Sequence, residues 1–268
     1  MSASLRSSAA ALLAAIAVPL GAVRAAAQAA PAGAPATAAP HEAAPRINAA
    51  RRGGAVQVDG RLDDAAWQAA QPITGFRQLD PREGEPVSER TEARVLIDDD
   101  AIYIGMRMFD SDPAGIQKQL ARRDESVEGD IAEVYLDSYH DHLTAYVFRL
   151  SPAGARRDAA VTLGGQQDNS WDAVWEGKSS VDAEGWSAEF RIPLSQLRYD
   201  PGIADHTWGI QLARKIARKA EVAMFSFTPK NEQQGVHRYG HLTGLGRLAS
   251  PRRLELTPYV LAKNEHPT

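Results

Sequence analysis

Hard oxygen ligands for a metal ion gather in two Asp-rich turns of the sequence. The first contains Asp98, Asp99 and Asp100, and the second contains Asp110 and Asp112 on either side of Ser111. Calcium takes about six to eight oxygen ligands, several of them from carboxylates and carbonyls in loops. A structural calcium ion held by Asp110 and Asp112 is therefore one expectation. Aspartate also favours turns without any ion, and that is the alternative.

Two histidines with one residue between them could bind a transition metal. His140 and His142 would lie on the same side of an extended segment. Zinc needs a third and usually a fourth protein ligand, and none has an identifiable spacing here. We therefore expect a turn with solvated histidines.

Motifs of common enzymes are absent from the sequence. It has no cysteine, no Gly-x-Ser-x-Gly elbow, no phosphate-binding glycine loop and no zinc-protease helix. Glycoside hydrolysis needs only two carboxylates at a suitable separation, and Asp124, Asp130, Glu133 and Asp137 lie close together in the chain. A glycosidase stays as an alternative to a non-catalytic domain.

Trp171 and Trp175 could form an aromatic surface for a ligand. Residues four apart in an extended segment point the same way, and Asp168, Asn169 and Asp172 would give this surface a polar rim. Core packing is the competing interpretation, because tryptophan is usually buried.

The elements that position these residues are strands. Apolar residues alternate with polar or small residues in the segments 102–108, 146–150, 186–192 and 208–212. A period of two residues is typical of strands with one buried face. Turn residues separate these segments, including Asp-Pro and Gly-containing runs.

Helical signals are short. We expect helical turns at residues 63–70 and 195–197, and the run from Val58 to Trp67 predicts a strand, a glycine turn and a helical turn whose tryptophan caps the core. Many strands with few helical residues predict an all-β fold, an antiparallel β-sandwich of the jelly-roll type.

The charge pattern argues against nucleic acid as a partner. The chain has 30 basic and 34 acidic residues and a formal net charge of −4, whereas nucleic-acid binding needs a basic surface. The one basic cluster, residues 214–219, is expected to be a solvated strand end.

Four segments are expected along the chain. Residues 1–27 have the charged, apolar and small-residue layout of a signal peptide, residues 28–45 form an Ala/Pro-rich linker, and residues 46–249 form the sandwich. Residues 250–268 begin another alternating strand that needs partners. We therefore expect an exported protein of the periplasm, the outer membrane or the wider cell envelope.

Five runs together carry a resemblance to a known family: Val58–Trp67, Asp98–Asp110, Asp130–Glu133, Gly185–Pro193 and Tyr239–Leu242. From about Arg46 onward the chain is similar to carbohydrate-binding module family 9, in the form found at the N-terminus of bacterial envelope proteins with a C-terminal membrane barrel of unknown function. The resemblance implies a sandwich, sugar recognition and, in some members, bound calcium. It also implies that residues 250–268 begin a truncated barrel region.

The resemblance places the family's sugar-contacting Glu and Arg at Glu133 and Arg149. The alternation of the two strands sends both side chains to the surface, where charge-assisted hydrogen bonds could hold sugar hydroxyls. A cross-strand ion pair of about 0.2–1 kcal/mol is the equal alternative. Val127 and Gln233 stand near the positions of the family's two sugar-stacking tryptophans, so that platform is missing.

These observations favour a non-catalytic glycan-binding domain, associated with carbohydrate catabolism, with Glu133, Arg149, Trp171 and Trp175 as its ligand-binding residues. Its partner would be a saccharide, and in a full-length form an outer-membrane barrel. One alternative is a periplasmic accessory or plug domain of such a barrel. The other is a glycoside hydrolase acting on O-glycosyl bonds.

Overall fold

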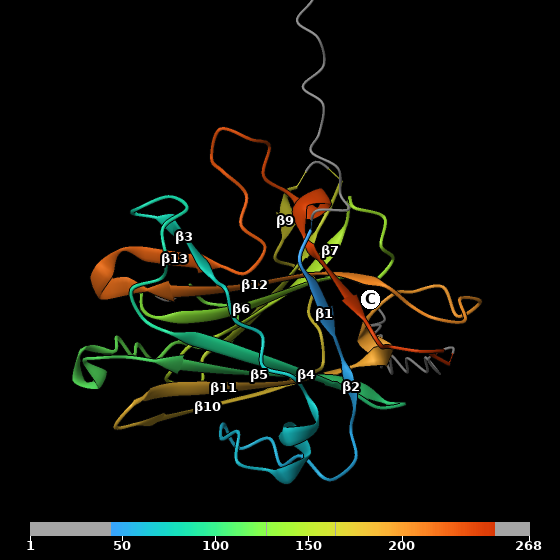
Figure 1. Ribbon diagram of the computed structural model, residues 1–268, viewed down its shortest axis with the longest axis horizontal. Helices are drawn as coiled ribbons and strands as arrows, with labels where there is room; N and C mark the ends of the chain where they lie inside the picture. The colour runs from blue at the N-terminus through green and yellow to red at the C-terminus, as the bar shows by residue number, and fades with distance from the viewer. Residues whose placement is uncertain (1–43, 127, 164, 250–268) are drawn as a thin grey trace, which may run out of the picture. The chain divides into compact units, whose positions relative to one another are not determined.

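Two β-sheets packed face to face make up the described part of the chain (Figure 1). The computed structural model describes residues 44–126, 128–163 and 165–249. The predicted signal peptide, most of the predicted linker and the predicted barrel segment lie outside these residues. None of the helical turns in the described ranges is long and apolar enough to cross a membrane.

The larger sheet has nine strands in the described residues. Its main path runs in the order β1 (Arg46–Asn48), β14 (Gly240–Thr243), β12 (Trp208–Ile216), β6 (Ile131–Asp137), β7 (Ala145–Leu150), β8 (Arg156–Val161) and β9 (Gln167–Asp168). Off this path, β13 (Glu221–Met224) pairs with β12 and with β3 (Arg77–Asp80).

The smaller sheet has five strands, in the order β10 (Glu176–Asp182), β11 (Gly185–Pro193), β5 (Ala101–Phe109), β4 (Thr91–Ile97) and β2 (Ala50–Arg51). Two pairs are parallel, β1 with β14 and β2 with β4. The other pairs are antiparallel, so the predicted antiparallel sandwich is confirmed, with a parallel pair at one edge of each sheet. The chain passes directly from β1 in one sheet to β2 in the other (Figure 1).

The inner faces of both sheets consist of the apolar positions of the alternating segments. Ile104, Phe148, Trp186, Trp208 and Ile210 all have no exposed surface and belong to one core cluster. Successive side chains of a strand point to opposite faces, which is why the two-residue period located these core positions.

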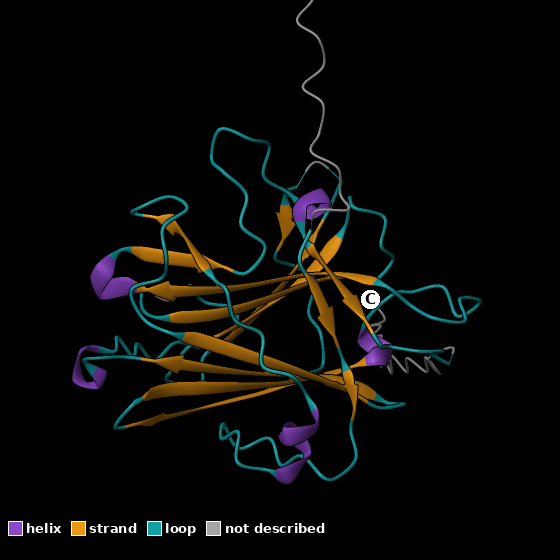
Figure 2. Cartoon of the chain, viewed as in Figure 1, coloured by secondary structure: helices purple, strands orange, loops and turns teal. Residues whose placement is uncertain are grey.

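The helical turn η2 (Ala65–Ala69) forms where it was expected, but its tryptophan does not enter the core between the sheets. Trp67 belongs to a second, smaller cluster with Leu96 and Tyr103 on the outer face of the five-stranded sheet. Figure 2 shows this helical turn outside the layers of strands. Gly105 permits the close approach, because a Cβ atom there would lie 3.1 Å from the Trp67 ring. Trp67 is therefore buried in a hydrophobic cluster, as its predicted structural role requires, but this cluster is not the one between the two sheets.

The remaining helical turns are also short. They are η3 (Pro113–Gly115), η4 (Leu194–Gln196), η5 (Ala217–Lys219) and η6 (Val236–Arg238). The turn η4 lies at the position expected for a helical turn at 195–197. The basic cluster gave a different outcome, because Arg214 on β12 has no exposed surface. The expectation that this cluster is solvated was wrong for Arg214, whose position in the alternation points inward together with Leu212.

Candidate functional site

A row of three charged side chains crosses the outer face of the nine-stranded sheet. Glu133 on β6 lies opposite Arg149 on β7, and Arg149 lies opposite Arg157 on β8. The neighbours Val134 and Phe148 are fully buried on the other face. Glu133 and Arg149 therefore project outward, as the alternation predicted.

Glu133 and Arg149 form a half-buried pair. Nε of Arg149 donates to Oε2 of Glu133 at 3.2 Å, Nη2 donates to Oε1 of Gln167 at 2.9 Å, and the Tyr135 hydroxyl donates to the same Glu133 oxygen. The side chains are 13 % and 18 % exposed for Arg149 and Glu133. Burial opposes the charge on Arg149, but the interactions with Glu133 and Tyr135 together outweigh it and raise the pKa of the guanidinium. The cross-strand ion pair expected as an alternative is present.

A hollow of about 200 Å³ lies beside this pair. Ile131, Arg149, Ser151 and Arg157 contribute to its walls from the strands and the loops at their ends, and Glu125 and Ser126 contribute from the loop before β6. Nη1 of Arg149 and Nε of Arg157 are buried and have no hydrogen-bond partner among the described residues. Buried donors without partners are costly. These N–H groups are already desolvated, so donating to a ligand would add little desolvation cost.

The two tryptophans proposed as a platform do not form one. Trp175 is 3 % exposed, its ring is stacked on Phe190 with centroids 5.7 Å apart, and its Nε1 donates to Asp158 at 2.9 Å. Trp171 is half-buried against Tyr146, with ring centroids 4.7 Å apart. The four-residue spacing does place both rings on the same side, as predicted, but that side faces the core. Trp175 is therefore corrected from a binding residue to a core residue.

The two positions of the family's stacking tryptophans offer no aromatic face. Gln233 is exposed in the loop between β13 and η6, and Val127 lies outside the described residues. Tyr135 and Tyr239 form an aromatic pair in this region, with ring centroids 5.8 Å apart. Tyr239 is itself buried. A ligand at Glu133 and Arg149 would thus be held mainly by polar groups.

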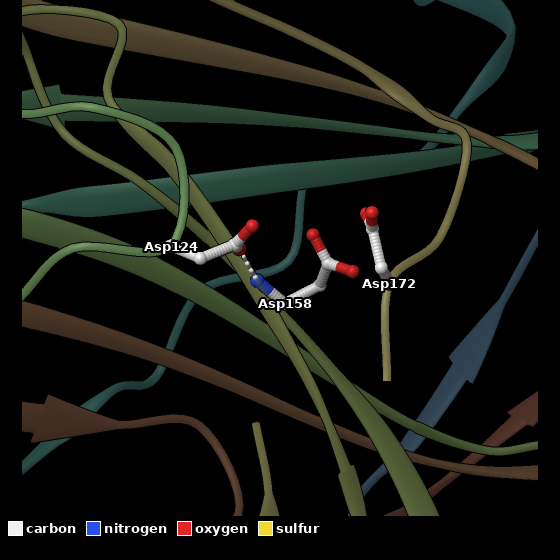
Figure 3. Close-up of side chains that lie close together, drawn as sticks. All are labelled: Asp124, Asp158 and Asp172. Atoms are coloured by element: carbon white, nitrogen blue, oxygen red, sulfur yellow. Dashed lines mark hydrogen bonds between the residues drawn. The ribbon is translucent and has the colours of Figure 1, made fainter. Parts of the chain in front are cut away.

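Three carboxylates that are far apart in the sequence lie close together at β8. Asp124, Asp158 and Asp172 lie side by side in Figure 3, and their ligand atoms fall within 4.8 Å of one another. In the part of the chain that the structure describes, no other group of metal-ligating side chains meets that distance. The Arg123 guanidinium bonds both Asp158, at 3.0 Å, and Asp172. An arginine therefore supplies the positive charge in this cluster.

The carboxylates considered for glycoside hydrolysis are dispersed. Asp130 and Asp137 flank opposite ends of β6, and Glu133 lies between them on the outer face. Asp124 belongs to the cluster around Arg123.

Asp110 belongs to an ion-pair network at one end of the sandwich. Both oxygens of Asp110 accept hydrogen bonds from Arg218, at 2.8 and 2.6 Å, and Arg214 lies 3.5 Å away. The Asp112 side chain is 62 % exposed and lies 4.0 Å from Arg218. The two aspartates do share a turn, as expected, but arginine occupies the oxygens that calcium would use. Calcium at Asp110 and Asp112 stays a prediction.

The two histidines lie in a turn after β6, as predicted, but they are not isolated. His241 on β14 brings its Nδ1 to 3.2 Å from Nε2 of His140, and the rings of His140 and His142 have centroids 4.4 Å apart. The backbone N–H of His142 donates to Asp137 at 2.9 Å. Sequence spacing could not have found His241, because strand pairing brings it there from about a hundred residues away.

Asp137 predicts a pH dependence of stability. Burial raises its pKa to about 6, above the value in the unfolded chain, so the folded state binds the proton more tightly. The free energy of unfolding therefore falls as pH rises from about 4 through 6, and this group contributes a decrease on the order of 3 kcal/mol. Urea denaturation at a series of pH values measures it.

Asp137→Asn should flatten part of this slope. Glu189, whose pKa burial raises to about 7, contributes a slope of the same sign and keeps the remainder. An unchanged slope in Asp137→Asn would contradict the assignment, whatever its effect on absolute stability.

Comparison with known proteins gives a family and a fold. A family model described as "Carbohydrate family 9 binding domain-like" matches residues 58–240. No curated protein sequence matches. A carbohydrate-binding module family 9 from Caldicellulosiruptor kristjanssonii has been solved with cellotriose (TM-score 0.51, 17% identity, covering 80% of this chain and 98% of that one). A carbohydrate-binding module family 9 from the same organism, solved with glucose, gives a TM-score of 0.52 at 16% identity, covering 80% and 100% of the two chains. A candidate carbohydrate-binding protein from Bacteroides uniformis gives 0.58 at 12% identity, covering 75% and 99%.

Proposed function

Because the chain belongs to the carbohydrate family 9 binding domain-like family, we propose that it is a non-catalytic domain that binds a saccharide. Its ligand is a glycan or a saccharide end, held on the outer face of the nine-stranded sheet. Glu133 and Arg149 are the central contacts. Solved relatives with the same fold are bound to cellotriose in one structure and to glucose in another.

One observation carries the proposal: the half-buried guanidinium of Arg149 lines a small hollow and pairs with the half-buried Glu133 carboxylate beside it, and its Nη1 has no partner in the described residues. Hydroxyl groups can both donate and accept, so a sugar can bond Glu133 as a donor and Arg149 as an acceptor. Charge-assisted hydrogen bonds are roughly twice as strong as neutral ones. Polar contacts of this kind can compensate for the missing stacking platform.

The cellular setting is part of the same proposal. The composition of residues 1–27 supports export through a signal peptide. The domain then works in the periplasm or at the outer membrane, in the uptake or breakdown of carbohydrate, and next to a membrane barrel in a full-length form.

Arg149→Ala should weaken saccharide binding about a hundredfold, because it removes a charged donor from a desolvated site and leaves Glu133 without its partner. Isothermal titration of the protein against glucose, cellotriose and a glycan array measures this. Arg191→Ala is a matched control, because Arg191 makes a similar cross-strand pair with Glu176, at 2.9 Å, on the outer face of the other sheet.

Equal weakening in the Arg191→Ala control would show that the effect is not local to the site. If the wild-type protein binds no saccharide on the array, the proposal fails and an accessory role beside a barrel takes its place. Hydrolysis of aryl glycosides, abolished by replacing one carboxylate, would instead reveal a glycosidase.

A further inference from the structure

The hollow beside Arg149 has an excess of positive charge. Three arginines, Arg149, Arg156 and Arg157, and one carboxylate, Glu125, contribute to its lining. Glu133 beside Arg149 adds a second carboxylate. Three guanidinium groups thus face two carboxylates, and one positive charge remains uncompensated.

Of these three arginines, only Arg149 has an ion pair among the described residues. Arg156 donates to the carbonyl oxygen of Trp175 at 2.7 Å, and Arg157 is the unpaired guanidinium that lies opposite Arg149. Its Nη1 donates to Oγ of Ser126 at 3.1 Å and its Nη2 to Oδ1 of Asn169 at 2.8 Å, and both acceptors are neutral. No carboxylate among the described residues lies within 4.0 Å of this guanidinium. Its Nε is buried without a partner. A charge held this way favours an anion from outside the protein.

Arg149 and Arg157 lie directly opposite each other on neighbouring strands. Like charges in directly opposite positions destabilise a sheet, and the single Glu133 carboxylate lies on the far side of Arg149 from Arg157. A bound anion between the two arginines would relieve this repulsion. Each arginine offers it one donor that is buried and unpartnered, Nη1 of Arg149 and Nε of Arg157.

The nearby carboxylate cluster does not cancel this charge. Asp158 follows Arg157 on β8, so its side chain points to the opposite face of the sheet, where it is fully buried. Arg123 bonds Asp158 and Asp172 and compensates part of their charge. The site of the uncompensated Arg157 is therefore separate from the cluster.

We propose, on the basis of the saccharide-binding function above, that the ligand is an anionic saccharide whose carboxylate or sulfate group lies between Arg149 and Arg157. The planar guanidinium group suits both anions, because it can donate two parallel hydrogen bonds. The hollow, at about 200 Å³, is smaller than the roughly 300–1,000 Å³ of pockets for drug-sized ligands. It fits one terminal sugar residue.

The test compares four probes by isothermal titration: glucuronate, glucose 6-sulfate, glucose and inorganic sulfate. We expect glucuronate or glucose 6-sulfate to bind at least about tenfold more tightly than glucose, since charge-assisted bonds exceed neutral ones. The difference between the two acidic sugars identifies the anion. The preference should also decrease as salt rises, because the charges are only partly buried.

Arg157→Gln should lower the affinity for the acidic sugars by at least about tenfold and so abolish their advantage over glucose, because Gln keeps hydrogen-bonding groups without the charge. Arg157→Lys keeps the positive charge but loses the planar group that can donate two parallel hydrogen bonds. It should therefore retain part of the preference for acidic sugars. Arg191→Gln, on the other sheet, should change nothing. Circular dichroism verifies that each variant folds.

Three results would overturn the inference, and they are distinguishable. Equal affinity for glucose and both acidic sugars removes the anionic ligand but leaves saccharide binding in place. Binding of inorganic sulfate as tight as that of glucose 6-sulfate shows an anion site without a sugar. Failure of all four probes, together with a blank glycan array, removes the proposed function as well.

Discussion

Asp110→Ala should lower the free energy of unfolding by about 3–5 kcal/mol, because it removes the ion-pair partner of a buried arginine. Arg214 has no exposed surface and lies 3.5 Å from Asp110, and burial lowers the pKa of Arg214 to about 10 despite that neighbour. The remaining contacts of its guanidinium are the Thr91 hydroxyl, at 3.2 Å, and backbone carbonyls. Arg218 would also lose both of its hydrogen bonds to Asp110.

Urea denaturation at neutral pH measures this effect, and Asp112→Ala is the matched control. Asp112 lies in the same turn with a side chain that is 62 % exposed, so its replacement should cost less than about 0.5 kcal/mol. Similar losses in both variants would contradict the ion-pair role. Repeating the experiment with calcium and with a chelator tests the calcium prediction, because an ion bound only by the folded state would raise wild-type stability.

The network also supports the candidate site. The backbone N–H of Ala217, the first residue of η5, donates to Asp130 at 3.0 Å, and the N–H of Asp130 donates to the carbonyl of Gln117 at 3.1 Å. The segment from 117 to 130 includes Glu125 and Ser126 of the hollow. These hydrogen bonds therefore tie the two ends of that segment to each other and to the residue before Arg218.

Glu189→Ala should have the second large effect, a loss of about 3 kcal/mol or more in the free energy of unfolding. The Glu189 carboxylate is 1 % exposed and accepts hydrogen bonds from the backbone N–H groups of Asp59, at 2.9 Å, and Gly60, at 2.8 Å, and from Nε1 of Trp67, at 3.1 Å. Removing the carboxylate leaves these donors without an acceptor, and an unsatisfied buried donor costs about 1–3 kcal/mol. Loss of these hydrogen bonds would detach the segment that covers the outer face of the five-stranded sheet.

Thermal denaturation and hydrogen exchange distinguish local from global loss. Protection from hydrogen exchange should fall most at Asp59 and Gly60, because the backbone N–H groups of both residues donate to the Glu189 carboxylate and would lose that acceptor. Glu176→Ala on the neighbouring strand is the control, since that side chain is 58 % exposed in its pair with Arg191 and should change stability by less than about 1 kcal/mol. A stable Glu189→Ala variant with unchanged amide protection would refute the role.

The fold was predictable because alternation is a local property. The two-residue alternation of apolar and polar residues in each strand indicates which side chains face the core. This pattern correctly placed Ile104 and Phe148 inside. It also correctly placed Glu133 and Arg149 outside. The η2 and η4 turns followed from local signals in the same way. The family resemblance rested on short runs of this kind, and the family match over residues 58–240 confirms it.

The sequence alone thus determined the all-β class, the family and the two faces of each strand. Tertiary structure decided what lies against each face, because that depends on contacts between segments far apart in the chain. It placed Trp67 outside the sandwich over Gly105 and Trp175 inside it against Phe190. It also buried Arg214 beside Asp110 and aligned Arg157 with Arg149. A side chain's direction is fixed by its neighbours in sequence, but its burial and its charge partners are fixed by segments that local periodicity does not describe.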